Sequence, residues 1–229
     1  MKVILFGATG MVGQGALREC LLDPEVERVL TVGRRKTGQK HEKLIEITHE
    51  DFTDFTPIER DLSGWDACFF CLGVSSAGMT EAAYRRVTYD VTLAAGRVLA
   101  KRNPGMTFLY VSGTGTDSTE KGRSMWARVK GETENALLKL PFKAAYMLRP
   151  AYIQPLHGIT SSTGWTRALY AVMGPAYPVW KTLFPKYVTT TEQLGLAMLH
   201  IAKHGNPKLV LENEDLALLG RTPSASRKA

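Results

Sequence analysis

Cysteine and long apolar runs are both scarce in this sequence. Its 229 residues include three cysteines, Cys20, Cys68 and Cys71. Three cysteines form no disulfide framework, and we expect a cytoplasmic location. Cys68 and Cys71 have the spacing of a redox pair, but they lie in an apolar run typical of a buried strand, so we expect both to pack in the core. No run of about 18 apolar residues occurs, so no membrane-spanning helix is predicted.

The sequence also lacks a concentrated patch of charge and any grouping of metal ligands. The formal net charge is +7, yet lysine and arginine are scattered, with one local cluster at Arg34, Arg35 and Lys36. Nucleic-acid-binding domains gather basic residues on one face or carry a known module, so no nucleic-acid partner is predicted. The five histidines are dispersed, and no metal site is expected.

Apolar strands alternate with helices along the first two thirds of the chain. The pattern predicts strands at 2–7, 28–33, 43–48, 67–73, 107–113 and 144–150, and helices at 11–22, 80–102 and 124–138. Several of the strands are apolar on both faces, which is typical of a parallel sheet covered by helices on both sides. We therefore expect an α/β fold with a Rossmann-like, doubly wound parallel sheet.

After Pro150 this alternation stops, and a stretch rich in aromatic residues, proline and glycine runs to Tyr187. A helix at 191–202, a strand at 208–212 and a helix at 214–220 follow. This tail is too short for an independent domain. We therefore expect one domain over residues 1–229, in which residues 151–229 contribute a small helical and loop lobe on the substrate side, over the carboxyl edge of the sheet.

The first strand leads directly into three glycines at the start of the first helix. Gly7, Gly10 and Gly13 serve a dinucleotide site in three ways: a tight turn, approach of the backbone to the pyrophosphate, and close packing of helix on strand. The spacing differs from G-x-G-x-x-G, but its place after an apolar strand predicts a pyrophosphate at the helix N-terminus. The predicted cofactor contacts in this turn are Gly7, Thr9, Gly10, Met11, Val12 and Gly13.

The end of the second strand indicates which nucleotide binds. NAD-dependent proteins usually place Asp or Glu there for the ribose 2′-hydroxyl, whereas arginine accommodates a 2′-phosphate. Here the sequence is "TVGRRK", without an acid. Arg34 and Arg35 therefore favour NADP(H) over NAD(H), through charge-assisted hydrogen bonds. Asp51 is assigned to the exocyclic amine of adenine, and Phe52 to the face of its ring.

Six motifs carry a family resemblance, in the order "GATGMVGQG", "GRR", "DF", "CLGVS", "YVSGTG" and "WARVKGETE…LRP". Together they resemble the short-chain dehydrogenase/reductase superfamily, in particular its atypical NAD(P)-binding branch, with the Tat-interacting-protein-like group and proteins described as NAD-dependent epimerase/dehydratase-like. The resemblance covers Met1 to about Pro155. It implies a Rossmann-type fold, a nicotinamide cofactor beside Leu72 and Gly73, and a Ser/Tyr/Lys set with Tyr and Lys four positions apart on a helix.

Carried over residue by residue, the resemblance assigns catalytic roles to Ser112 and Lys130. Ser112 matches the serine that hydrogen-bonds the substrate carbonyl. Lys130 matches the lysine that holds the ribose hydroxyls and lowers the pKa of the tyrosine. Trp126 occupies the tyrosine position, and because an indole N–H does not titrate in water, Trp126 cannot be the general acid. We expect Trp126 to form a wall of the nicotinamide pocket.

Without the tyrosine, the sequence leaves three functions open. In the first, the protein is an oxidoreductase or epimerase whose proton comes through water or from Tyr84, Tyr152 or His157. In the second, it is a non-catalytic NADPH-binding sensor or regulatory interaction protein. In the third, the Rossmann core is only structural, against which the glycine motif and the basic cluster both argue.

The substrate pocket is the least defined part of the prediction. Six aromatic residues lie between Gly164 and Tyr187, and they indicate a pocket or lid for a moderately apolar small molecule. A homodimer face or a peripheral membrane contact is the alternative use of this segment. Arg149 either contacts the ligand or anchors its loop. The residues assigned to the substrate pocket are Ser112, Trp126, Arg149 and Tyr152.

Overall fold

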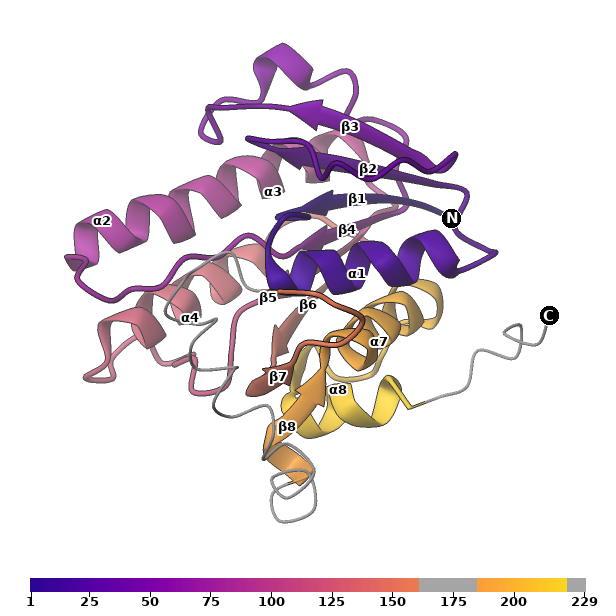
Figure 1. The fold of residues 1–229 in the computed structure, drawn as a ribbon. Helices are drawn as coiled ribbons and strands as arrows, with labels where there is room; N and C mark the ends of the chain where they lie inside the picture. Colours follow the sequence, from indigo (N-terminus) through magenta and orange to yellow (C-terminus); the bar gives the residue numbers. More distant parts are fainter. Residues whose placement is uncertain (161–184, 222–229) are drawn as a thin grey trace.

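The computed structural model describes residues 1–160 and 185–221. A seven-stranded parallel sheet runs through them in the order β3-β2-β1-β4-β5-β6-β9 (Figure 1). This order confirms the Rossmann-like α/β fold that the sequence predicts. The strands are β1 (Lys2–Phe6), β2 (Arg28–Gly33), β3 (Leu44–Thr48), β4 (Ala67–Phe70), β5 (Thr107–Val111), β6 (Ala144–Arg149) and β9 (Val210–Glu212).

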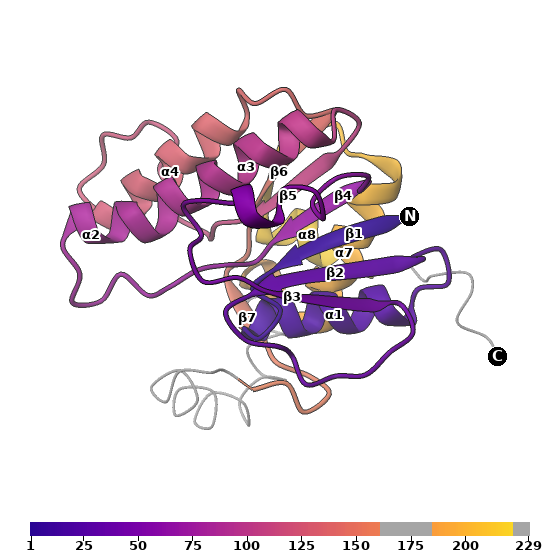
Figure 2. The same cartoon turned by 90° about the horizontal axis from the view of Figure 1, so that it is seen from above.

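Helices cover both faces of this sheet (Figure 2). Alternate residues of β1 divide between the two cores: Val3 and Leu5 pack into one, Ile4 and Phe6 into the other. Because both faces are buried, β1 is apolar at four successive positions, as central strands of parallel sheets usually are. The first core contains residues of α1 (Met11–Leu22), α7 (Thr191–His204) and α8 (Asn213–Leu219), and the second contains residues of α3 (Val91–Arg102) and α4 (Met125–Leu137).

Glycine allows α1 and α7 to approach closely. A Cβ atom on Gly15 would lie 2.7 Å from the carbonyl oxygen of Thr191, and one on Gly195 would lie 3.1 Å from that of Gly15. Neither position has room for a side chain unless a helix moves. No local sequence pattern predicts this contact, which holds the C-terminal helix against the helix that begins at the glycine turn.

The helix predicted at 80–102 is continuous but not uniform. α2 (Glu81–Arg85) passes into a π-helical segment (Arg86–Asp90), which passes into α3. Arg85 lies at the junction and donates to Glu132 of α4 from Nε, over 3.1 Å. No proline or glycine occurs at the junction, so the sequence pattern predicts one regular helix.

The tail contributes to the main sheet as well as to a lobe. β9 pairs with β6, Leu148 lying opposite Leu211. β7 (Tyr152–Gln154) and β8 (Val188–Thr190), the latter preceded by a 3₁₀ turn (Pro185–Tyr187), form a separate parallel pair beyond the carboxyl end of β6. The side chain of Asn213 ties the two parts together, because it accepts from the Ala151 N–H at 2.9 Å and donates to the Lys186 carbonyl at 2.8 Å.

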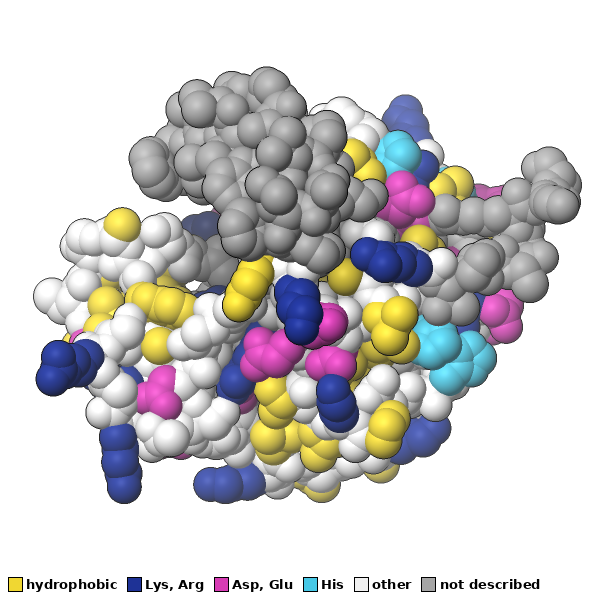
Figure 3. All heavy atoms as spheres, turned by 90° about the horizontal axis from the view of Figure 1, so that it is seen from below, with side chains coloured by type: hydrophobic (Ala, Val, Ile, Leu, Met, Phe, Trp, Pro, Cys, Tyr) yellow, Lys and Arg dark blue, Asp and Glu magenta, His cyan; other side chains and the backbone are white. Residues whose placement is uncertain are grey.

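The surface shows how charge and apolar groups are distributed. On the face shown in Figure 3, lysine and arginine are dispersed among acidic, apolar and other side chains. Within residues 1–160 and 185–221, no helix is long and apolar enough to cross a membrane. Of the aromatic segment, Tyr187 is 58% exposed, and the other five aromatic residues lie outside the described residues.

Candidate nucleotide and substrate site

The glycine turn leaves the start of α1 open to an anion. Gly7 has φ +79°, and a Cβ on Gly13 would lie 2.0 Å from the Gly7 carbonyl oxygen, so the turn closes against the helix. Gly10 is the N-cap, no side chain caps the helix, and its first turn contains no acid. Uncapped N–H groups at a helix N-terminus favour a bound phosphate. The geometry here therefore suits the pyrophosphate that the sequence predicts.

A cavity of about 380 Å³ lies beside this turn. Phe52 forms part of its wall and is fixed edge-on against Phe6, with ring centroids 6.3 Å apart. Arg34 and Arg35 line the opening with exposed side chains. The cavity is lined by Gly7, Ala8, Thr9, Thr31, Val32, Gly33, Arg34, Arg35, Phe52 and Leu72.

Asp51 lies outside the set of residues that line this cavity. Its Oδ1 accepts from the N–H and the hydroxyl of Thr53 at 2.8 and 2.6 Å. These hydrogen bonds lower the pKa of the Asp51 carboxyl. Phe52 thus lines the first cavity, while Asp51 closes an Asx turn beside it.

A second cavity, of about 670 Å³, adjoins the first at Leu72. It lies where β4, β5 and β6 end, the edge at which parallel α/β sheets bind ligands. Trp126 and Lys130 project into it from α4, four positions apart as predicted. The lining residues are Gly10, Met11, Val12, Cys71, Leu72, Gly73, Val74, Val111, Ser112, Gly113, Thr114, Trp126, Lys130, Pro150, Ala151 and Ile153.

Lys130 is the cationic group of this cavity's lining. Its ammonium donates to the backbone carbonyl of Ser112. Burial lowers the pKa of Lys130 to about 8, although the carboxylate of Glu134 opposes the shift. A lysine in this state can hold a ribose hydroxyl and can also exchange a proton near neutral pH.

Ser112 borders the cavity, but its hydroxyl is engaged inside the protein. Its Oγ lies 2.5 Å from Glu134 Oε1 and 3.1 Å from the Leu148 carbonyl oxygen. Thr114, two residues on, has an exposed side chain at the cavity, and its hydroxyl donates to the Arg149 carbonyl at 2.9 Å. The family resemblance assigned the hydrogen bond to a substrate carbonyl to Ser112 alone. The "SGT" sequence also places a second hydroxyl, that of Thr114, just after the strand.

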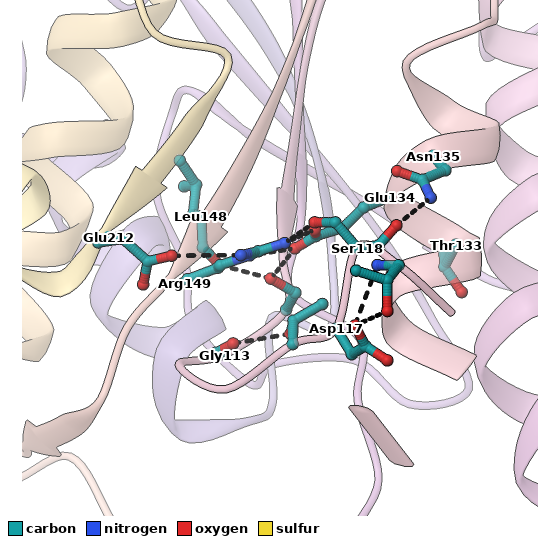
Figure 4. A network of polar contacts seen from close by, with 12 residues as sticks. Gly113, Asp117, Ser118, Thr133, Glu134, Asn135, Leu148, Arg149 and Glu212 are labelled. Carbon is teal, nitrogen blue, oxygen red and sulfur yellow. Dashed lines mark hydrogen bonds and ion pairs between the residues drawn. The ribbon is translucent and has the colours of Figure 1, made fainter. Parts of the chain in front are cut away.

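Arg149 belongs to a buried polar network rather than to the cavity lining (Figure 4). Its Nε donates to Glu134 Oε1 at 3.1 Å, and its Nη1 to Glu212 Oε1 at 3.2 Å. Its Nη2 reaches the hydroxyl of Ser118 at 2.5 Å. Of the two roles that the sequence left open for Arg149, the geometry supports the anchoring one.

The three side chains considered as replacement acids are not among the described residues that line the second cavity. Tyr84 is 2% exposed within the α2–α4 layer. The Tyr152 hydroxyl donates to Gln154 at 2.8 Å. His157 lies 2.6 Å from Glu192 and borders a separate pocket beside α1. Trp126 does line the cavity, as expected of a wall.

A Rossmann-like sheet with an open glycine turn between two adjoining cavities is typical of NAD(P)-binding proteins. Comparisons with known proteins support this class. The chain is 30% identical over 153 residues to Protein FMP52-2, mitochondrial, of Scheffersomyces stipitis, an alignment that covers 65% of each chain. It is 28% identical over 154 residues to Protein HTATIP2 of Rattus norvegicus, covering 66% of this chain and 62% of that protein. The alignments thus span just under two thirds of these relatives. No protein-family model matches the chain.

Solved structures show the same fold. The crystal structure of DesIV, a dTDP-glucose 4,6-dehydratase from Streptomyces venezuelae with NAD and TYD bound, superposes with a TM-score of 0.66 at 14% identity, covering 96% of this chain and 80% of that one. The chain is thus similar in sequence to HTATIP2 and FMP52, and it shares its fold with a dTDP-glucose 4,6-dehydratase. The resemblance carried by the six motifs is confirmed.

The predicted cytoplasmic location is wrong. FMP52 relatives from several fungi are named mitochondrial. One of them, from Saccharomyces cerevisiae, is 24% identical over 91% of this chain. Three unpaired cysteines indicate a reducing environment, but they do not distinguish one compartment inside the cell from another.

Proposed function

We propose that this protein binds NADP(H) and acts as an oxidoreductase or epimerase on a moderately apolar carbonyl compound. The observation that carries the proposal is the N-terminus of α1, which has neither a side-chain cap nor an acidic first turn. Backbone N–H groups and the helix dipole both favour an anion there. The sheet edge beside it holds the two adjoining cavities that a dinucleotide requires.

In this proposal the nucleotide extends across both cavities. The adenosine lies beside Phe52, the pyrophosphate lies against the glycine turn, and the nicotinamide enters the cavity with Trp126 and Lys130. Leu72 lines both cavities and marks the passage between them. The exposed guanidinium groups of Arg34 and Arg35 at the first opening favour a 2′-phosphate, and hence NADP(H).

When bound, NADPH supplies a hydride. The chain supplies the surroundings of the reacting carbon: Lys130 holds the ribose, and Trp126 forms a flat wall. Val74, Val111 and Ile153 add apolar surface to the same cavity. Such a lining suits a moderately apolar substrate. A small number of polar groups in the cavity would fix its orientation.

A non-catalytic NADPH-binding sensor is the second candidate. It is favoured by Trp126, which does not titrate, and by Ser112, whose hydroxyl is engaged by Glu134 rather than being free for a substrate carbonyl. The glycine turn, the arginines and Lys130 suffice for binding alone. Turnover of a carbonyl probe by the purified protein distinguishes the two candidates.

Nucleotide binding is tested by titrating NADPH and NADH against the full chain and following nucleotide fluorescence. We expect NADPH to bind at least about tenfold more tightly, from charge-assisted contacts to its extra phosphate. Arg34→Ala should abolish this preference. Lys36→Ala is the matched control, because Lys36 is an exposed cation in the same loop but does not line the cavity. Equal affinities in the unmodified protein would refute the NADP(H) assignment.

A further inference from the structure

The second cavity contains few groups that can give up a proton. Of its described lining residues, two have titratable side chains, Lys130 and Cys71. Burial raises the pKa of the Cys71 thiol well above its usual range, which makes it a poor acid. The Thr114 hydroxyl does not titrate near neutral pH, and it donates to the Arg149 carbonyl. Of the described lining residues, Lys130 is therefore the remaining candidate for a proton donor.

The position of Lys130 is fixed by the helix that carries it. A Cβ on Gly131 would lie 1.8 Å from the Asp117 carbonyl oxygen, so α4 lies directly against the loop that follows β5. Asn135 reinforces this contact by donating to the Ser118 carbonyl at 3.0 Å. One N–H of the Lys130 ammonium is used on the Ser112 carbonyl. An ammonium has three N–H groups, so two can face the cavity.

The nearest carboxylate does not compensate the charge on Lys130 fully. Glu134, one turn along α4, is paired with Arg149 and accepts from the Ser112 hydroxyl. The ion pairs found among residues 1–160 and 185–221 do not include Lys130. A buried ammonium without its own counter-ion readily becomes neutral. Burial thus lowers the pKa of Lys130 although Glu134 lies one turn away.

We infer that the Lys130 ammonium is itself the proton donor to the substrate oxygen, in the place where related proteins use a tyrosine. This inference rests on the proposed reductase function. In the reduction, the carbonyl carbon receives the hydride of the nucleotide, which becomes oxidised, and the C=O π electrons move to oxygen. That oxygen takes a proton as an N–H bond of Lys130 breaks. The neutral amine then regains a proton from water.

The test combines nucleotide binding, turnover and a direct titration of the lysine in the full-length protein. The carbonyl probes are phenanthrenequinone and para-nitrobenzaldehyde with NADPH. We expect the wild-type rate to fall as pH rises through about 8, because the donor must be protonated. Lys130→Arg keeps the positive charge but does not release a proton, so turnover at saturating NADPH should fall by about 10²-fold or more; nucleotide fluorescence measures NADPH binding of the variant separately.

A second readout does not depend on activity. In protein labelled with ¹³C at the lysine ε-carbon, the Lys130 resonance is the one missing from Lys130→Arg, and it should titrate with a midpoint near 8. Lys139→Arg is the control, because Lys139 is an exposed residue just beyond the end of α4. It should change neither turnover nor the Lys130 resonance.

The outcomes separate this inference from the proposed function. If the wild-type protein does not bind NADPH, both the proposed function and the role of Lys130 are overturned. Binding without reduction of either probe would overturn the role of Lys130 and favour the sensor. Turnover that survives in Lys130→Arg, a flat rate between pH 6 and 9, or a Lys130 midpoint above about 10, the value of an ordinary lysine, would each overturn it while leaving NADP(H) binding intact.

Discussion

Arg149, the last residue of β6, holds the carboxylate of Glu134 on α4 through Nε at 3.1 Å and Nη2 at 2.5 Å. Both residues are buried: Glu134 is 1% exposed and Arg149 is 9% exposed. Arg149 also reaches Glu212 at the end of β9. The pair therefore fixes the helix that carries Trp126 and Lys130 relative to two strands of the sheet.

Glu134→Gln should destabilise the protein. It leaves the Arg149 guanidinium buried with the half-exposed Glu212 as its remaining carboxylate. Breaking a buried ion pair by removing one partner typically costs about 3–5 kcal/mol, and the retained hydrogen-bonding capacity of Gln should reduce this toward the lower value. Denaturant unfolding measures the change. Glu81→Gln, which breaks the more exposed pair with Arg128, should have a much smaller effect, and equal effects would contradict the role of the network.

Gly131→Ala should displace α4 from the loop after β5. Alanine usually favours a helix over glycine by about 1 kcal/mol, but here its Cβ would lie 1.8 Å from the Asp117 carbonyl oxygen. We expect a net loss of about 1–3 kcal/mol in the free energy of unfolding, together with weaker NADPH binding.

The matched control for this substitution is Gly105→Ala, since no atom lies within 4 Å of a Cβ at that position. Thermal unfolding of both variants provides the comparison. A stabilised Gly131→Ala protein would mean that the loop moves aside easily, and that it does not fix Lys130.

Lys130→Met should stabilise the protein at pH 7. Burial lowers the pKa of Lys130 to about 8, below the value of about 10.4 for a lysine in an unfolded chain. Between these pH values the unfolded state binds more protons than the folded state. The charged lysine therefore lowers the free energy of unfolding below pH 8. This cost disappears as the pH rises toward 10. The gain should be on the order of 1–3 kcal/mol at pH 7 and much smaller at pH 10. Denaturant unfolding at both pH values checks it; a pH-independent gain would contradict the desolvation of this group.

Trp126→Tyr should raise turnover of the carbonyl probes by at least about tenfold, because a phenol beside Lys130 adds a second group that can pass a proton. Trp126→Phe keeps an aromatic wall but adds no such group, and it should not increase the rate. Steady-state kinetics with NADPH measures both variants. If Tyr and Phe behave alike, a side chain at this position does not reach the reacting oxygen.

The fold and the residues beside the glycine turn follow closely from the sequence. The glycine turn, the basic residues after β2 and the Trp126–Lys130 pair depend on short spacings within one element, and short spacings determine which side chains share a face. The parallel sheet follows in the same way from strands that are apolar on both faces.

The polar network could not be predicted from spacing. The Ser112 hydroxyl donates to Glu134, which lies 22 residues away on α4, and Arg149 pairs with a carboxylate 63 residues further along the chain. Which hydroxyl faces the cavity, Ser112 or Thr114, depends on where Glu134 lies after the sheet and helices have packed. Asp51 differs, because its partner Thr53 lies only two residues along the chain, a spacing typical of an Asx turn.

The pairing of β7 with β8 brings the chain back to the place where β6 ends. Tyr152 lies opposite Val188, and Gln154 lies opposite Thr190, so the chain departs from the scaffold and rejoins it at one place. Connecting loops generally tolerate changes in length and composition better than the elements that they connect. Variation between Gln154 and Val188 would thus leave the register of β6 and β9 unchanged.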